Sequence, residues 1–300
     1  MTERIRVAVI FGGRSSEHEI SCISAGSVLR ALDRSKYDVV PIGITKSGQW
    51  VLEADNADRL AIVDGVFPHV NESNVPVLFT PDPSATHLVV QSEVPDVLAH
   101  VDVAFPVLHG PFGEDGTIQG VFELAGIPYV GNGVFASAAA MDKAFLKALM
   151  SAAGIAVGPF EVITDTQWEY HRDDALNRVR ALGFPLFVKP TRAGSSVGIS
   201  KVKNESELVD AIEVARTHDP KVIVEASIEN AREVECGVIS TPQGTQASVC
   251  AEIIVREGHE FYDYEAKYVD DSVDLIVPAN LSENVSQRVR QIACQAFDAI

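Results

Sequence analysis

The sequence has few basic residues for its length. It contains 24 Lys and Arg against 42 Asp and Glu, which gives a formal net charge of −18 at pH 7 over 300 residues. A surface that binds nucleic acid needs clustered Lys and Arg to neutralise phosphates. The composition therefore argues against a nucleic-acid partner, and any phosphate site in this chain must be a local basic pocket.

Long apolar runs, a signal peptide and paired cysteines are also lacking. No segment approaches the about 18 consecutive apolar residues of a membrane helix, and the stretch MTERIRVAVIFGG has no h-region with a cleavage site. The four cysteines lie far apart in the sequence without a C-x-x-C pair, so we interpret them as reduced thiols rather than a disulfide framework or zinc site. These absences predict a cytoplasmic protein without a membrane partner.

The common nucleotide motifs are absent or incomplete. There is no G-x-x-x-x-G-K-[ST], and GNGVFA at 131–136 imitates a dinucleotide fingerprint without the acidic residue expected about 20 positions later. The stretch KPTRAGSSVGISKV, residues 189–202, contains G-x-S-x-G, the nucleophile elbow of α/β-hydrolases, with Ser196 as the nucleophile. An elbow requires a strand-to-helix turn, whereas here a strand-like segment follows, so a serine hydrolase is kept only as the alternative from another class.

The same loop admits two further interpretations. Its glycines and serines suit a mobile hairpin that closes over phosphate, with backbone N–H groups and hydroxyls as donors and Lys189 as the charge. They suit a solvent-exposed turn about equally well. The loop by itself does not decide between these interpretations.

The first part of the chain has the pattern of an open α/β domain. Residues 5–11 form a near-continuous apolar strand, a helix is expected to start near Ser21 or Ser24, and VVPIGIT at 39–45 is a second strand. Residues 56–96 show little periodicity and are interpreted as a variable excursion. A strand–helix–strand unit of this kind predicts a parallel sheet.

The pattern changes after residue 137. A single Ala-rich helix is expected from about residue 138 to Gly154, followed by two strands, FPLFVKP and SVGISKV, that form a hairpin around the Gly/Ser loop. We therefore expect three domains, at 1–137, 138–225 and 226–300.

Six long stretches resemble the D-alanine:D-alanine ligases of the ATP-grasp superfamily. They occur in the family's order: GGRSSEHEIS, FPVLHGPFGEDGTIQG, MDKAF, FVKPTRAGSSVG, AREVECGV and FYDYEAKY. The resemblance implies an ATP-grasp fold, α/β with α+β character in the later domains, preceded by an open parallel-sheet domain. It also implies ATP-dependent ligation of two D-alanine molecules through a D-alanyl phosphate, for peptidoglycan synthesis. The nearer alternative is a related D-alanyl ligase with another second substrate, such as D-lactate.

The resemblance assigns residues to the nucleotide. Lys143 and Lys189 match lysines that contact the phosphates, and Ser195 and Ser196 match the loop serines that cover them. Glu225, Ala226 and Ile228 match residues that contact the adenine, and Glu233 matches the residue that contacts the ribose. Tyr262 and Lys267 match residues of the loop that closes over the nucleotide. A carboxylate such as that of Glu233 suits a vicinal diol because it offers two acceptor oxygens.

The resemblance also assigns residues to the amino-acid substrate. Glu17 matches the carboxylate that holds the ammonium group of the first D-alanine through a charge-assisted hydrogen bond. His109 matches a histidine beside that site. Ser195 and Tyr268 match the residues that link to Glu17 by hydrogen bonds, and a tyrosine at 268 implies an amine rather than a hydroxyl acceptor.

Two Mg²⁺ (or Mn²⁺) ions are expected together with ATP. The family's metal ligands and its oxyanion arginine have no counterpart up to Ile300, so we expect them in a segment beyond this residue and name no metal ligand. The expected assembly is a homodimer.

Overall fold

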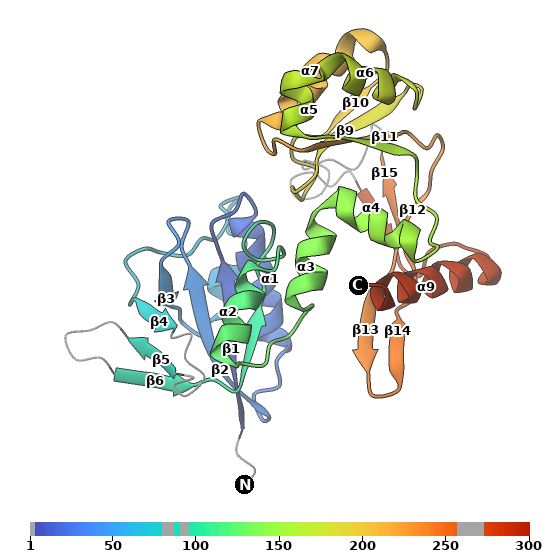
Figure 1. Ribbon diagram of the computed structural model, residues 1–300. Coiled ribbons are helices and arrows are strands. Elements are labelled where there is room, and N and C mark those ends of the chain that lie inside the picture. Colours follow the sequence, from blue (N-terminus) through green and yellow to red (C-terminus); the bar gives the residue numbers. More distant parts are fainter. Residues whose placement is uncertain (1–3, 80–86, 91–95, 257–272) are drawn as a thin grey trace. The chain divides into compact units, whose positions relative to one another are not determined.

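The computed structural model describes residues 4–79, 87–90, 96–256 and 273–300. It divides into two compact units, Met1–Ala138 and Ala139–Ile300, each with its own sheets and helices (Figure 1). Among the described residues, no helix has the length and apolar character needed to cross a membrane. The finer division into three domains stays a prediction.

A four-stranded sheet forms the centre of the first unit, in the order β3-β2-β1-β7. Strand β1 (Ile5–Gly12) runs parallel to β2 (Tyr37–Ile44) and to β7 (Val103–Pro106), while β3 (Trp50–Leu52) pairs antiparallel at the edge. The predicted open parallel sheet is therefore confirmed.

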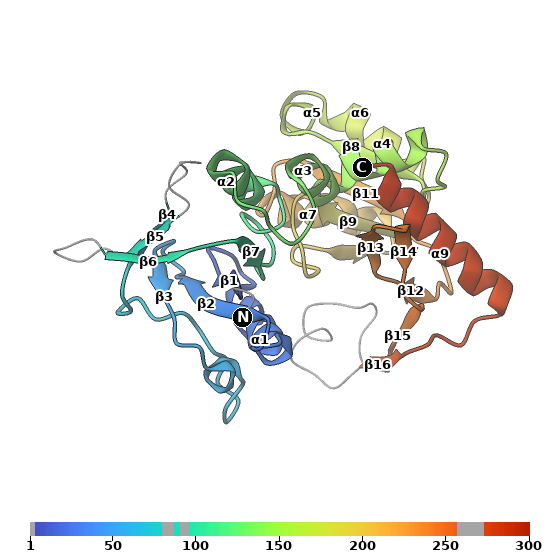
Figure 2. The same cartoon turned by 90° about the horizontal axis from the view of Figure 1, so that it is seen from below.

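Alternate residues of β1 face the two helices of this unit. Val7, Val9 and Phe11 pack in one core with α1 (His18–Ala31), and Ala8 and Ile10 pack in the other with α2 (Thr117–Ala125). Figure 2 shows these helices on opposite sides of the sheet. A strand covered on both faces needs apolar residues at successive positions, which is why β1 is apolar without interruption from Val7 to Phe11.

The prediction that the first helix starts at Ser21 or Ser24 was wrong, because α1 begins at His18. Ser21 is not a cap: its Oγ accepts a hydrogen bond from Gly12 N (2.8 Å) and donates one to Val107 O (2.5 Å). The hydroxyl joins the helix to the ends of two parallel strands. The predicted start of α2 at Thr117 and its stop at Gly126, in the left-handed region, are confirmed.

The stretch interpreted as a variable excursion contains short elements. These are the 3-10 helix η1 (Ala57–Leu60) and an antiparallel sheet of β4 (Val77–Phe79), β5 (His87–Val90) and β6 (Asp96–His100).

The single Ala-rich helix predicted from residue 138 was also wrong. The chain forms two helices, α3 (Val134–Met141) and α4 (Lys143–Ala152), that are interrupted at Asp142. The Asp142 side chain accepts hydrogen bonds from the backbone N–H of Ala144 (3.0 Å) and Phe145 (3.3 Å). It therefore caps a new helix at the point where the apolar pattern alone suggests continuation.

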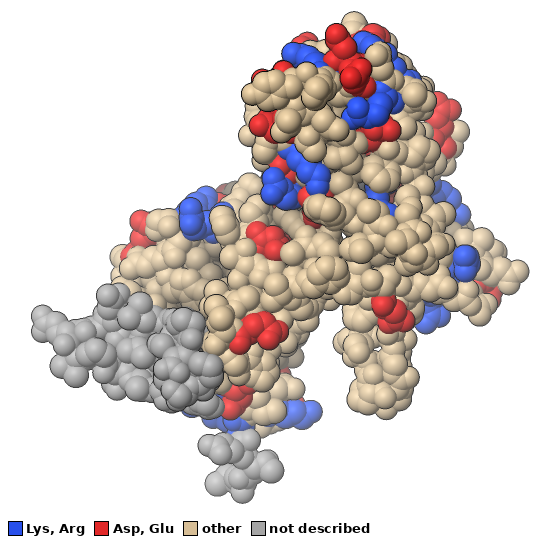
Figure 3. All heavy atoms as spheres, in the orientation of Figure 1, with Lys and Arg blue, Asp and Glu red and all other residues tan. Residues whose placement is uncertain are grey.

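The first sheet of the second unit is antiparallel, in the order β10-β9-β11-β8. Its strands are β8 (Phe160–Ile163), β9 (Leu186–Pro190), β10 (Ser200–Val202) and β11 (Val222–Ala226). Its helices are α5 (Asp165–Tyr170), α6 (Arg172–Arg180) and α7 (Glu205–Arg216). The pairing of β9 with β10 confirms the predicted hairpin. Figure 3 shows acidic and basic side chains mixed over the α5–α7 region.

The rest of the second unit consists of smaller sheets and one long helix. Strands β12 (Glu233–Glu235), β15 (Ala251–Val255) and β16 (Val273–Ile276) form an antiparallel sheet, and β13 (Val238–Thr241) pairs with β14 (Gly244–Ala247). The last helix is α9 (Glu283–Asp298).

His18 is the largest buried titratable side chain in the first unit's core. Its Nδ1 lies 2.8 Å from Gly13 O and its Nε2 lies 3.1 Å from Val70 N, so the ring fits as the neutral tautomer that donates from Nδ1 and accepts at Nε2. Burial lowers the pKa of His18, although the hydrogen bond to Gly13 opposes this shift. The folded protein therefore disfavours the imidazolium.

We predict that the free energy of unfolding falls as the pH is lowered below about 6.5, where histidine in the unfolded chain takes up a proton that folded His18 resists. The contribution is at most about 1.4 kcal/mol per pH unit. Urea unfolding at several pH values between 7.5 and 5.5 measures it. His18→Gln should reduce this slope, whereas His171→Gln, at the exposed start of α6, should keep it. Equal slopes in the two variants would contradict the assignment.

Candidate active site

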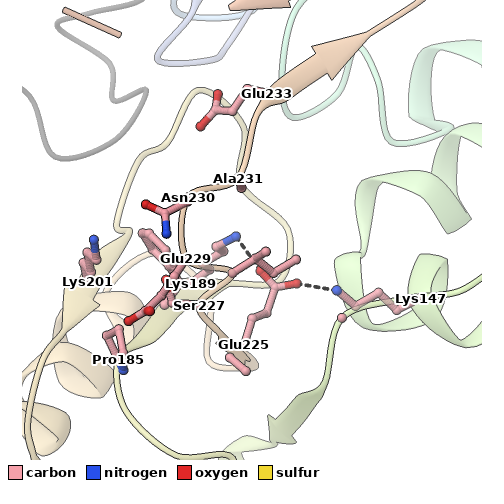
Figure 4. Close-up of a pocket in the computed structure, with 14 residues that line it drawn as sticks. Lys147, Pro185, Lys189, Lys201, Glu225, Ser227, Glu229, Asn230, Ala231 and Glu233 are labelled. Carbon is pink, nitrogen blue, oxygen red and sulfur yellow. Dashed lines mark ion pairs between the residues drawn. The ribbon is translucent and has the colours of Figure 1, made fainter. Parts of the chain in front are cut away.

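The larger of two pockets described here lies in the second unit and has a volume of about 730 Å³. Residues of α4, β9, β10 and β11 and of the segment leading into β12 line it (Figure 4). Four residues that the resemblance assigns to the adenosine are among them: Glu225, Ala226, Ile228 and Glu233. The pocket thus gathers side chains that the sequence places on separate elements.

Glu225 lies between two lysines in this pocket. Its Oε1 is 2.7 Å from Lys147 Nζ, and its Oε2 forms an ion pair with Lys189 Nζ, as the dashed lines in Figure 4 show. Burial by itself raises the pKa of Glu225, but Lys189 and Lys147 together lower it below its usual value. The carboxylate is therefore held ionised, with both oxygens oriented.

Sheet register explains why Lys189 and Glu225 meet. Lys189 on β9 is paired with Ile223 on β11, and Glu225 lies two residues further along the same strand. Side chains two positions apart on a strand share a face, so Lys189 and Glu225 are diagonal neighbours across the pair.

Lys147 was missed by sequence reasoning. It lies one helical turn after Lys143 in α4, and residues four apart share a helix face. That spacing was the available signal, but a lysine on a helix is normally solvated, and its partner lies on a distant strand.

Lys143 has a different environment from the one expected for a phosphate ligand. It is not among the residues that line the pocket. Its Nζ donates to Ala193 O at 2.6 Å and lies 3.4 Å from the carbonyl oxygens of Pro190 and Thr191. Burial, followed by the charge of Lys189, lowers the pKa of Lys143. In this structure Lys143 therefore holds the start of the Gly/Ser loop.

Asp219 anchors the same loop from the other side. Its carboxylate accepts hydrogen bonds from Thr191 Oγ1 (2.8 Å) and from Arg192 through both the backbone N–H and the guanidinium (2.7–2.9 Å). Burial raises the pKa of Asp219, but these donors and Lys221 N outweigh it and lower the pKa to about 2. The first residues of the loop are consequently held in place.

The tip of the loop adopts left-handed backbone conformations. Ser195, Ser196 and Gly198 have φ of 48°, 60° and 71°. A β-carbon at Gly198 would lie 2.5 Å from His218 Cδ2, so this position requires glycine for space as well as for conformation. After Ser196 the chain enters β10 rather than a helix, which is not the geometry of a nucleophile elbow.

The two substrate-site motifs of the first unit lie side by side. Ser15 Oγ donates to His109 O at 2.9 Å, and Ser24 Oγ lies 3.1 Å from His109 Nε2. Glu17 is 4% exposed, and its Oε2 is 2.5 Å from the position that a β-carbon on Gly110 would take. The fold thus brings Glu17 and the His109 segment together, at the carboxyl ends of β1 and β7.

A smaller pocket of about 230 Å³ adjoins these residues. His109, Gly13 and mainly apolar side chains, including Leu108 and Phe112, line it. The guanidinium of Arg14 lies over the ring of Phe112, 5.2 Å from the ring centre.

Three assigned residues, Tyr262, Lys267 and Tyr268, lie outside the described residues. Ser195 and Ser196 are not among the residues lining the larger pocket. The expected link between Glu17, Ser195 and Tyr268 therefore stays a prediction. In the part of the chain that the structure describes, no group of three or more His, Cys, Asp or Glu side chains is placed to hold a metal ion.

Family models match nearly the whole chain. The model for the N-terminus of D-ala D-ala ligase matches residues 6–132, and the model for its C-terminus matches residues 149–300. A D-alanine–D-alanine ligase of Mycobacterium ulcerans is 53% identical, with 99% of this chain and 81% of the relative covered. One of Streptomyces avermitilis is 51% identical over 98% of this chain and 78% of the relative.

Solved structures agree with these matches. VanG D-Ala:D-Ser ligase from Enterococcus faecalis superposes with a TM-score of 0.83 at 37% identity, covering 99% of this chain and 83% of the other. The D-alanine-D-alanine ligase from Coxiella burnetii gives a TM-score of 0.78 at 31% identity, with 99% and 78% covered. With both halves matched by family models and by solved structures, the chain belongs to the D-alanine–D-alanine ligase family and has its ATP-grasp fold.

Proposed function

We propose that the protein joins two D-alanine molecules into D-alanyl-D-alanine, with conversion of ATP to ADP and phosphate, for peptidoglycan synthesis. The observation that carries the proposal is the match of both family domains along the chain. The pocket around Glu225 offers three lysines to a nucleotide, Lys147, Lys189 and Lys201. Together with Glu225, Glu229 and Glu233 they make its lining formally neutral in a chain of net charge −18.

The larger pocket is the proposed ATP site. The Glu225 carboxylate accepts a hydrogen bond from the exocyclic amine of adenine, with Ala226 and Ile228 along the base, and Glu233 accepts from the ribose hydroxyls. Lys189 turns from Glu225 to the phosphates when these enter, while Lys147 stays with Glu225 and keeps its carboxylate charged and oriented. Lys143 contributes charge beside the phosphates and holds the base of the loop.

D-alanine binding is proposed for the place in the first unit where Glu17 meets the His109 segment. His109 lines the smaller pocket there, whereas Glu17 is not among its lining residues. Glu17 holds the ammonium group of the first D-alanine, and His109 lies beside it. Ammonium and carboxylate are among the few groups that this small zwitterion offers, so a buried carboxylate aimed at the amine is an effective contact.

Two loops are proposed to close over the reacting groups. Ser195 and Ser196 cover the phosphates from the hairpin, and Tyr262, Lys267 and Tyr268 contribute from the segment around 261–268. Closure excludes water that would otherwise hydrolyse a D-alanyl phosphate. An amine acceptor completes the ligation by displacing phosphate.

Family members use ATP with a divalent metal. The described residues contain no cluster that fits such an ion, so no step is derived through it. On the resemblance alone we propose two ions, Mg²⁺ or Mn²⁺, a homodimeric assembly and a cytoplasmic location.

The function is tested by release of ADP from ATP with magnesium present. We expect release with D-alanine and none with L-alanine, together with D-alanyl-D-alanine as the product. Because a similar structure is named for D-serine as second substrate, D-serine and D-lactate should be offered as competing acceptors. Absence of D-alanine-dependent ADP release would overturn the proposal.

We predict that Lys147→Met raises the KM for ATP roughly tenfold, about 1.4 kcal/mol, because Glu225 loses one of its two cations. The KM for D-alanine at saturating ATP should not change. Lys147→Arg should restore most of the loss, since arginine can also bridge to a carboxylate. Lys36→Met, which removes an exposed lysine from its ion pair with Asp33, is the control. An unchanged KM for ATP in Lys147→Met would contradict a role for Lys147 in ATP binding.

We predict that Glu17→Gln raises the KM for the first D-alanine roughly ten- to hundredfold, because a hydrogen bond to a charged group contributes about 1.5–3 kcal/mol. The Kd for ATP, measured by calorimetry, should stay the same. Glu19→Gln, two residues further along the chain and paired with Lys46, is the matched control. Normal D-alanine saturation in Glu17→Gln would contradict this role.

A further inference from the structure

Cys236 and Cys250 are cross-strand neighbours, although 13 residues separate them in the sequence. In the antiparallel pairing of β12 with β15, Glu235 faces Ala251, so the next position of the ladder sets Cys236 opposite Cys250. Beyond the cysteines the two chains are still joined, because Ser248 N donates to Gly237 O (2.8 Å) and Gly237 N donates to Ser248 Oγ (3.0 Å). The thiol pair thus lies between the regular ladder on one side and, on the other, a contact shifted by one residue, since Val249 and not Ser248 would face Gly237 in register.

This register suits a disulfide bond. Opposed residues of antiparallel strands have Cα atoms about 4.5–5.5 Å apart, and disulfides span Cα separations of about 4.4–6.8 Å. Their Cβ atoms, however, are about 4.5–5.5 Å apart, whereas a disulfide prefers about 3.8 Å. The strands must close slightly, so the bond would be strained and readily reduced.

A third thiol lies close by. The pKa of the Cys236 thiol is raised, first by burial and then by Cys250 and Cys294, and a side-chain hydrogen bond with Cys250 contributes to the shift. Cys250 is buried, whereas Cys236 and Cys294 are half-buried. The four cysteines are free thiols, as the sequence predicts, but strand pairing and α9 bring three of them close together, which their spacing in the sequence does not indicate.

We propose that Cys236 and Cys250 are a redox modification site, which a peroxide converts into a reversible intramolecular disulfide. The Cys236 thiol, the more exposed of the two, takes one oxygen from hydrogen peroxide and becomes a sulfenic acid, with release of water. The Cys250 thiol then attacks that sulfur, the S–S bond forms and a second water leaves. The two thiols together lose two electrons and two protons, and the peroxide is reduced to water.

The bond would act on the nucleotide pocket through β12. Glu233 begins this strand and lines the pocket, and the preceding Arg232 is already fixed to Glu252 by two hydrogen bonds of 2.6 and 2.7 Å. Closing the strands at Cys236 fixes the other end of a three-residue strand, so the strain reaches Glu233. This consequence rests on the proposed function and predicts several-fold weaker ATP binding in the oxidised protein.

The site is tested by mapping disulfides in the reduced protein after treatment with hydrogen peroxide. Free thiols are blocked, the protein is digested, and linked peptides are identified by mass spectrometry. We expect a Cys236–Cys250 link that dithiothreitol reverses and that forms faster at pH 8.5 than at pH 7, because the thiolate is the reactive form. Cys236→Ala and Cys250→Ala should each abolish the link, and Cys294→Ala should keep it. A link through Cys294, or none, would overturn the proposal.

The effect on the pocket is measured separately, as the Kd for ATP before and after oxidation. We expect oxidation to weaken ATP binding and dithiothreitol to restore it. In Cys236→Ala, a substitution at a half-buried position, we expect the same Kd for ATP before and after treatment with hydrogen peroxide. Equal affinities in the mapped disulfide form and the reduced form would overturn the coupling to Glu233. If the reduced protein does not bind ATP at all, the proposed nucleotide site fails, while the mapped link still decides the thiol site.

Discussion

The site depends first on one carboxylate held between two lysines. Lys147 from α4 and Lys189 from β9 both pair with Glu225 in the pocket, and together they lower the pKa of its carboxyl group against the effect of burial. In a chain with a net charge of −18, the lining of this pocket is formally neutral, because three lysines balance three glutamates. In the proposed function, the same two lysines also keep this carboxylate ionised and oriented to accept a hydrogen bond from adenine.

The Gly/Ser loop combines a fixed base with a tip of unusual backbone. Asp219 and Lys143 hold the first residues of the loop from two sides, and Gly198 is required where the loop packs on His218. A base that is held in this way confines movement to the tip. This suits a loop that covers phosphate, since the donors return to the same place after each opening.

In the first unit, serine hydroxyl groups hold the segments of the proposed substrate site in place. Ser21 joins α1 to the ends of β1 and β7, and Ser15 and Ser24 fix the backbone and ring of His109. Glu17 at the start of α1 is thereby set against the His109 segment. The parallel sheet supplies the edge at which these segments meet, and the short polar side chains determine their spacing.

The sequence by itself determined the local elements and the family. The apolar run of β1, the hairpin around Ser196 and the order of the ligase motifs depend on neighbouring residues, which is why they could be predicted. Tertiary structure decided the rest. The start of α1 was misplaced because Ser21 finds partners on distant strands, and Lys147 was missed because its partner Glu225 lies on another element. Three cysteines that lie far apart in the sequence are brought together by strand register and α9. Contacts of this kind are set by the folded chain, and no local pattern records them.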